Sequence, residues 1–323
     1  MPLARPGSLV NPGGMSEDAP EPEWIVVGVS RSSASRYAVL WAAQEARIRR
    51  SVLLVTHIDP PSAYAPDLHD AATACHRLLA NSATVASEAQ PSVAVGTLLL
   101  TGSISDELIR LSQSAGLIVV GVDHDVPRAA HGAIGSIEDR VAVQAHCPVV
   151  GVTSAPQGVD DRRYVAVGWT HDPSGARALA AAVAVAAARG ASLTVVPGPT
   201  PAGEAPRSPK PGGPTAHHLH QALADAALQH PAMTVTVDWP VSNWVQTLIG
   251  HSAHASLLVI GSHHSDDWWS VRVGTTAGAV LRQASGPVML IGGSATTPAE
   301  PSLTGRPRRP EPTTPAVLTA GRP

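Results

Sequence analysis

The stretch Trp24-Ile-Val-Val-Gly28 returns 140 positions later in the chain as Tyr164-Val-Ala-Val-Gly168. A second apolar stretch, Leu117-Ile-Val-Val-Gly121, returns at the same offset as Leu257-Leu-Val-Ile-Gly261. Similarity at one fixed offset, in two separate places, indicates an internal repeat. The repeat unit is as long as an ordinary domain. We therefore interpret the chain as two tandem copies of one domain.

Proline marks the segments that lie outside these copies. Nineteen of the 30 prolines fall in 1–22, 197–214 and 294–323, and none of these stretches shows apolar periodicity. Such composition is typical of disordered segments. The 197–214 stretch is then a Pro-rich insertion within the second copy. The predicted parts are a disordered N-terminal tail (1–23), domain 1 (24–153), a linker (154–161), domain 2 (162–293) and a disordered C-terminal tail (294–323).

Each copy alternates short apolar runs with longer helical patterns. Runs that are apolar throughout are typical of strands covered on both faces, and strand–helix alternation implies right-handed crossovers and a parallel sheet. The sequence therefore predicts an α/β protein made of two tandem five-stranded parallel-sheet sandwiches. In domain 1 the expected strands are Ile25–Val29, Val52–Thr56, Val93–Leu100, Leu117–Val120 and Val149–Val152. The expected helices are Ser35–Arg50, Asp67–Ser87, Ser103–Ser114 and Ser136–His146.

Composition excludes several classes of function. The single lysine, Lys210, lies in the insertion, so the folded copies offer no lysine for a phosphate loop or a Schiff base. A net charge of −3 with only ten aromatic residues argues against a nucleic-acid partner. Cys75 and Cys147 form no CxxC motif. The longest apolar run, Ala178–Ala188, is too short to cross a bilayer, so we expect no membrane partner and a cytoplasmic location.

Candidate binding residues follow the first and fourth strands of each copy. Ligands of open α/β sheets lie at the carboxyl ends of the strands, near the point where the strand order reverses. A glycine–hydroxyl pair then opens the last helix, where free backbone amides favour an anion. These residues are Ser30, Gly121, Gly135 and Ser136 in the first copy, and Thr170, Gly261, Gly274 and Thr275 in the second.

The spacing of these residues resembles the G-x2-G-x9-G-[ST] nucleotide loop of the universal stress protein family. The second copy reads Gly261-x2-His264-x9-Gly274-Thr275, and the first reads Gly121-x2-His124-x10-Gly135-Ser136. The closing Cys147-Pro148-Val149-Val150 is also similar to the family. The resemblance covers both copies and implies a Rossmann-like fold of the adenine-nucleotide-binding type.

The resemblance also implies a function and a set of contacts. It implies an ATP-binding, nucleotide-responsive regulator of stress adaptation rather than an enzyme, with no catalytic residue. The two copies would form an intramolecular pseudo-dimer, packed through the last strands Val149–Val152 and Val288–Ile291, with a further homodimer possible. Adenine and ribose contacts would fall on Ser30, Thr170, Gly121 and Gly261, with His264 beside them. Phosphate contacts would fall on Gly135, Ser136, Gly274, Thr275 and Thr276.

Two departures from the family pattern favour an alternative. Ser30 and Thr170 stand where ATP-binding members carry an aspartate, and His124 and His264 replace the middle glycine of the loop. A pocket changed in this way fits a nucleotide-free interaction scaffold, and a slow nucleotide hydrolase is a third, weaker reading. We predict no metal site, because the densest histidine groups, His217-His218-x-His220 and His263-His264, lack the cysteines that would complete a zinc site, and the first group adjoins the insertion.

Overall fold

The computed structural model describes residues 23–60, 68–123, 137–153, 164–199, 214–240, 243–262 and 275–292. The predicted tails, the linker and most of the insertion lie outside these residues. The described part of each copy contains five strands and four helices. The first copy comprises β1 (Trp24–Gly28), α1 (Ser33–Arg49), β2 (Val52–Asp59), α2 (Leu68–Ala89), β3 (Val95–Thr101), α3 (Ile104–Leu111), β4 (Leu117–Gly121), α4 (Ile137–Gln144) and β5 (Val149–Val152). The second comprises β6 (Tyr164–Trp169), α5 (Pro173–Arg189), β7 (Ser192–Pro197), α6 (Pro214–Gln229), β8 (Val235–Val237), α7 (Trp244–His254), β9 (Leu257–Gly261), α8 (Thr275–Gln283) and β10 (Val288–Ile291).

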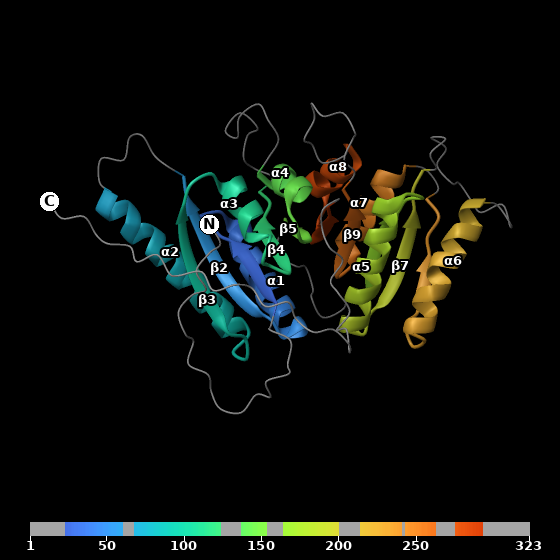
Figure 1. Cartoon of the computed structure of the whole chain (residues 1–323), viewed down its shortest axis with the longest axis horizontal. Helices are drawn as coiled ribbons and strands as arrows, with labels where there is room; N and C mark the ends of the chain where they lie inside the picture. The colour runs from blue at the N-terminus through green and yellow to red at the C-terminus, as the bar shows by residue number, and fades with distance from the viewer. Residues whose placement is uncertain are drawn as a thin grey trace, which may run out of the picture. The chain divides into compact units, whose positions relative to one another are not determined.

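The strands of both copies form one ten-stranded sheet, in the order β3-β2-β1-β4-β5-β10-β9-β6-β7-β8 (Figure 1). Within each copy every strand pair is parallel, as predicted. The two last strands, β5 and β10, pair antiparallel, with Met289 opposite Val150. That pairing leaves neither strand as a sheet edge. The strand order reverses beside β1 in the first copy and beside β6 in the second.

Equivalent local signals begin and end the long helix of each copy. Helix α1 follows the N-cap Ser32, and α5 follows the N-cap Asp172 with Pro173 in its first turn. Hydroxyl and carboxylate side chains are favoured at this position because they accept bonds from free backbone amides. Both helices end in a left-handed residue, Arg50 (φ 54°) and Gly190 (φ 60°). Glycine adopts this conformation freely, whereas arginine does so at a cost.

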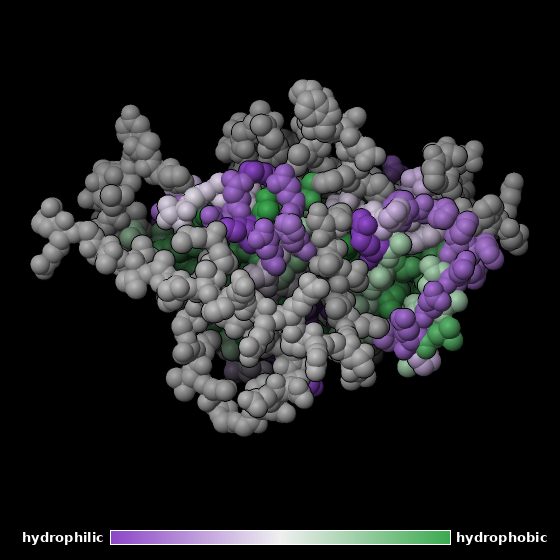
Figure 2. Space-filling model, in the orientation of Figure 1, coloured by the Kyte–Doolittle hydropathy of each residue, from purple (hydrophilic) through white to green (hydrophobic). Residues whose placement is uncertain are grey.

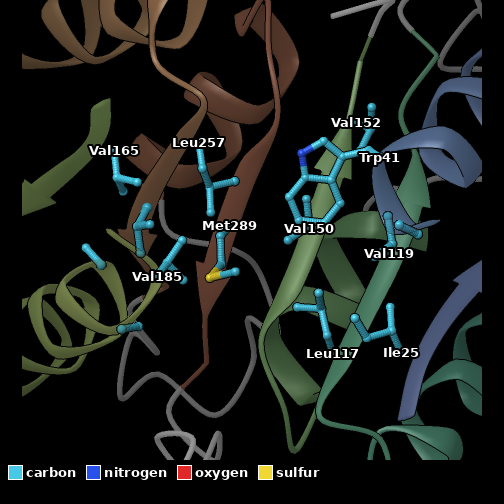
Figure 3. Close-up of a cluster of buried hydrophobic side chains, with 14 of the residues drawn as sticks. Ile25, Trp41, Leu117, Val119, Val150, Val152, Val165, Val185, Leu257 and Met289 are labelled. Carbon is cyan, nitrogen blue, oxygen red and sulfur yellow. The ribbon is translucent and has the colours of Figure 1, made fainter. Parts of the chain in front are cut away.

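The two copies share their hydrophobic cores. On one face of the sheet, a single buried cluster joins residues of α1 and β5 to residues of α5, β9 and β10. Figure 3 shows this cluster, with Trp41 and Val150 of the first copy and Leu257 and Met289 of the second. On the other face, Ala142 of α4 belongs to the same cluster as the apolar residues of α8. These two clusters contain residues of both copies, whereas a third, around Leu108 and Ile118, contains residues of the first copy alone. Since two of the three clusters join the copies, we expect the copies to fold and unfold together.

A buried ion-pair network crosses the boundary between the copies. Glu45 of α1 accepts from Arg189 of α5 (Nη2 to Oε2, 2.6 Å) and from Arg49 (Nε to Oε1, 2.7 Å). The Glu45 side chain is only 2% exposed, and the Arg189 guanidinium also lies 5.7 Å from the Trp41 ring centroid. Burial by itself raises the pKa of Glu45, but the charges of Arg189 and Arg49 outweigh it, so the net pKa is lowered.

A pair of equivalent serines holds the last helices in place. The Ser112 hydroxyl donates to the Ile109 carbonyl (2.6 Å) and accepts from the His146 amide (2.9 Å). Ser252, inside α7, makes the same two backbone bonds at 2.6 and 3.0 Å. Both hydroxyls are buried and engaged by backbone groups. The predicted helix Ser103–Ser114 ends earlier than expected, at Leu111, with Ser112 as its C-cap.

Candidate functional site

The candidate site of each copy begins where two neighbouring strands end. β1 and β4 are neighbours at the reversal point, and Gly28 is in register with Val120, next to Gly121. β6 and β9 repeat this arrangement at Thr170 and Gly261. The structure therefore brings each first-strand hydroxyl to the same edge as the fourth-strand glycine of its copy. This edge is where ligands of open α/β sheets bind.

In the first copy, three serines cluster at the start of α1. The Ser30 amide donates to Ser35 Oγ (2.9 Å), and the two hydroxyl oxygens lie 3.0 Å apart. Ser30 Oγ also donates to Ser32 Oγ (3.2 Å). Ser30 is exposed, so its hydroxyl faces solvent at the strand end. The cluster is uncharged and can both donate and accept hydrogen bonds.

In the second copy, a carboxylate occupies the same turn. The Asp172 carboxylate accepts from the amides of Ser174 (2.8 Å) and Gly175 (3.0 Å). Gly175 replaces the first copy's Ser35, and a Cβ there would lie 2.0 Å from the Thr170 carbonyl oxygen. The two turns therefore differ in charge, because Asp172 already neutralises the free amides of α5 that an anion would otherwise meet.

Gly121 and Gly261 permit a close approach of helix to strand. A Cβ on Gly121 would lie 2.6 Å from the backbone carbon of Ala34, at the start of α1. A Cβ on Gly261 would lie 2.1 Å from Ser174 Oγ and 2.9 Å from its carbonyl oxygen. Packing thus accounts for glycine at both positions without a ligand. The Ser174 hydroxyl is buried over Gly261 and has no hydrogen-bond partner in the described part of the chain.

The predicted phosphate end lies largely outside the described residues. Gly135, Ser136 and Gly274, with the loop histidines His124 and His264, belong to stretches the structure does not describe. Thr275 and Thr276 form the first turn of α8, and their side chains are not described. Helix α4 begins at Ile137, directly after Ser136. In sequence, α4 thus begins directly after its glycine–hydroxyl pair and α8 begins at the hydroxyl residue of its pair, and the first amides of a helix lack intrahelical partners.

Trp244 shapes the second site and is absent from the sequence prediction. Its Nε1 donates to the Val196 carbonyl (3.1 Å) at the end of β7. Its ring lies 3.1 Å from a Cβ built on Gly168 and 2.8 Å from one built on Gly198. The first copy has Ile104 at the equivalent position. Aligning the copies at their offset reveals this difference, although only the structure shows that the indole covers the ends of β6 and β7.

One group of side chains in the described residues could hold a metal ion. A ring nitrogen of His57, a carboxylate oxygen of Asp59 and Sγ of Cys75 all lie within 4.8 Å of one another. The histidine group His217-His218-x-His220 lies elsewhere, on α6. His218 stacks on His171 with 4.2 Å between ring centroids.

Comparison with known proteins shows the family of the chain. The family model of the "Universal stress protein family" matches residues 23–153 and 162–292. The chain is therefore a two-copy member of the universal stress protein family.

In the described parts of the chain, no helix has both the length and the apolar character that a bilayer crossing needs.

Relatives and solved structures of the same kind match nearly the whole chain. A universal stress protein of Mycobacterium tuberculosis is 26% identical over 275 residues, which cover 84% of this chain and 97% of that protein. One from Mycolicibacterium smegmatis is 27% identical, over 83% of this chain and 96% of that protein. The crystal structure of a universal stress protein from Archaeoglobus fulgidus superposes with a TM-score of 0.65 at 15% identity, over 83% of this chain and 98% of that one. The last comparison supports the α/β fold alone.

Proposed function

We propose that this protein binds an adenine nucleotide, ATP, and acts in stress adaptation as a nucleotide-responsive regulator rather than as an enzyme. The proposal includes a cytoplasmic location, where its two free cysteines stay reduced. It also treats the joined sheet as an intramolecular pseudo-dimer, with further homodimerisation possible. A regulator of this kind works by shifting a conformational equilibrium, so the nucleotide must bind one state better than another.

The observation that carries the proposal is the position of Ser30 and Thr170. Each lies directly beyond the strand at which the order reverses, beside a neighbouring strand that ends in glycine. Further along each copy a helix begins beside a glycine–hydroxyl pair of the sequence, α4 at Ile137 and α8 at Thr275. The hydroxyls at the strand ends suit the base and sugar of a nucleotide, and the free amides at the helix start suit its phosphates.

The donor groups on this edge favour binding over phosphoryl transfer. The described residues contain no lysine, so we expect backbone amides, hydroxyls, histidine and arginine to hold the phosphates. Efficient phosphoryl transfer relies on a positioned nucleophile and on cationic groups, such as a lysine, that stabilise the phosphate oxygens. We therefore expect modest affinity and no turnover coupled to function.

Isothermal titration calorimetry of the full chain with ATP tests the proposal. We expect saturable binding in the micromolar to millimolar range. Gly135→Val and Gly274→Val each add a bulky side chain to one copy's predicted phosphate end, so each serves as the control for the other. Loss of binding in one variant assigns the site to that copy. Absence of binding to the unaltered chain at millimolar ATP contradicts the proposal.

A nucleotide-free interaction scaffold is the second candidate function. The packing role of Gly121 and Gly261 favours it, because both glycines are explained without a ligand. The uncharged Ser30 and Thr170 also lack the carboxylate of the family pattern. Calorimetry separates the two candidates, since only the scaffold leaves ATP without measurable heat.

A further inference from the structure

Three different ligand types converge where β2 meets α2. His57 and Asp59 stand two residues apart at the end of β2, so their side chains lie on the same face of the sheet. Cys75 is buried on the same side of α2 as Leu79 and Ala86. Together they place a ring nitrogen, a carboxylate oxygen and a sulfur within 4.8 Å of one another.

The His57 ring is oriented as in many metal sites. Its Nδ1 lies 2.8 Å from the Val29 carbonyl oxygen. A carbonyl oxygen can only accept, so Nδ1 donates in this hydrogen bond and Nε2 is the ring nitrogen left to bind a cation. Metal-binding histidines typically donate their other ring nitrogen to a backbone carbonyl or carboxylate in this way. The hydrogen bond therefore fixes the tautomer that a cation requires.

The duplication supplies an internal comparison for these three residues. At the offset of 140, His57 and Asp59 correspond to Pro197 and Pro199, and Cys75 corresponds to Thr215. The alignment of α2 with α6 is supported by Leu79 and Ala86, because their counterparts in α6, Leu219 and Ala226, are also buried. The same fold therefore forms in the second copy without any of the three ligands, so packing alone does not require them.

We propose that His57, Asp59 and Cys75 bind a divalent cation of the zinc class. Nitrogen, sulfur and oxygen ligands together suit Zn²⁺, whose tetrahedral ligand atoms lie about 3.3–3.8 Å apart. The three atoms lie within 4.8 Å of one another, so binding one ion requires the side chains to close on it. Three protein ligands leave the fourth position to water. When sulfur binds, the thiol proton of Cys75 passes to solvent.

Titration of the full, reduced, chelator-treated chain with Co²⁺ tests this site. Cobalt takes the place of zinc and gives a thiolate-to-metal absorption band in the near ultraviolet when sulfur is a ligand. We expect the band to saturate at one ion per chain and to disappear when Zn²⁺ is added. The proposal does not depend on nucleotide binding, because ATP is absent from the experiment.

Matched variants distinguish this site from other cysteine or histidine groups. Cys75→Ser abolishes the band, while Cys147→Ser, at the other buried cysteine, retains it. His57→Gln and Asp59→Asn change partly exposed side chains and weaken cobalt binding at least about tenfold. Circular dichroism checks that each variant is folded. A wild-type chain without the band, or a band that survives in folded Cys75→Ser, overturns the proposal.

Discussion

Replacing Glu45 by glutamine tests whether the buried ion pairs join the two copies energetically. Glu45 accepts two charge-assisted bonds, at 2.6 Å from Arg189 and 2.7 Å from Arg49, and only 2% of its side chain is exposed. Removing one member of a buried pair costs about 3–5 kcal/mol because the remaining charge is left uncompensated. Glutamine keeps one acceptor oxygen, so we expect the free energy of unfolding to fall by about 3 kcal/mol. In a chain of this size that lowers Tm by about 6–12 °C.

The same variant changes how stability depends on pH. The folded-state pKa of Glu45 lies below its ordinary value of 4.5. Stability from a carboxylate of lowered pKa is fully present above the unfolded-state pKa and is lost as pH falls through the folded-state pKa. Urea denaturation followed by circular dichroism from neutral pH down to acid pH measures this. We expect a shallower acid-side loss of stability in Glu45→Gln than in the unaltered chain.

A surface pair supplies the matched acid-to-amide control. Asp106 pairs with Arg140 at 2.5 Å, but the two side chains are 55% and 44% exposed. Figure 2 shows the hydrophilic surface over α3 and α4, where this pair lies. Asp106→Asn should change stability by no more than about 0.5 kcal/mol. If Glu45→Gln costs as little as this control, the network does not hold the copies together and the reasoning is wrong.

Three further predictions concern a pair of glycines, a helix cap and a buried cysteine. Gly121→Ala places a Cβ 2.6 Å from the backbone of Ala34, so we expect the free energy of unfolding to fall by about 1–3 kcal/mol. In Gly250→Ala the new Cβ meets nothing within 4 Å, so we expect the free energy of unfolding to rise by about 0.5–1 kcal/mol through α7. Urea denaturation measures both changes. Arg50→Gly relieves the left-handed backbone at φ 54° and should raise stability by up to about 1 kcal/mol; an unchanged Tm would contradict a strained cap. Burial raises the pKa of the Cys147 thiol to about 12, so iodoacetamide at about pH 8 should alkylate this cysteine only after unfolding, as peptide mass spectrometry would show.

Sequence reasoning predicted the fold because its signals are local and repeated. The apolar runs at Trp24–Gly28 and Tyr164–Trp169 became strands, and each copy forms the predicted five-stranded parallel arrangement. Strand ends shifted by a few residues, as when the expected run Val93–Leu100 became β3 at Val95–Thr101. Such shifts arise because pairing with a neighbouring strand, rather than hydropathy, decides where a ladder stops.

The contacts that join the copies could not be predicted in this way. Glu45 and Arg189 lie 144 residues apart, and each reads in sequence as an ordinary charge on an amphipathic helix. Their burial follows from the antiparallel pairing of β5 with β10, which brings α1 beside α5. Trp244 was missed for a related reason, since a tryptophan at a helix start gives no sign of the strand ends it will cover.

The two copies share buried hydrogen bonds within their folds but differ at the carboxyl ends of their strands. Ser112 and Ser252 make the same pair of backbone bonds, so the scaffold of each copy is held alike. At the edge, by contrast, the end of β2 carries His57 where the end of β7 carries Pro197, and Trp244 has no aromatic counterpart. Because ligand affinity depends on these edge groups and not on the scaffold, the two sites should bind any shared ligand unequally. One stronger and one weaker or absent ATP site per chain is therefore expected, and two equal sites would show that the edge differences lie outside the binding contacts.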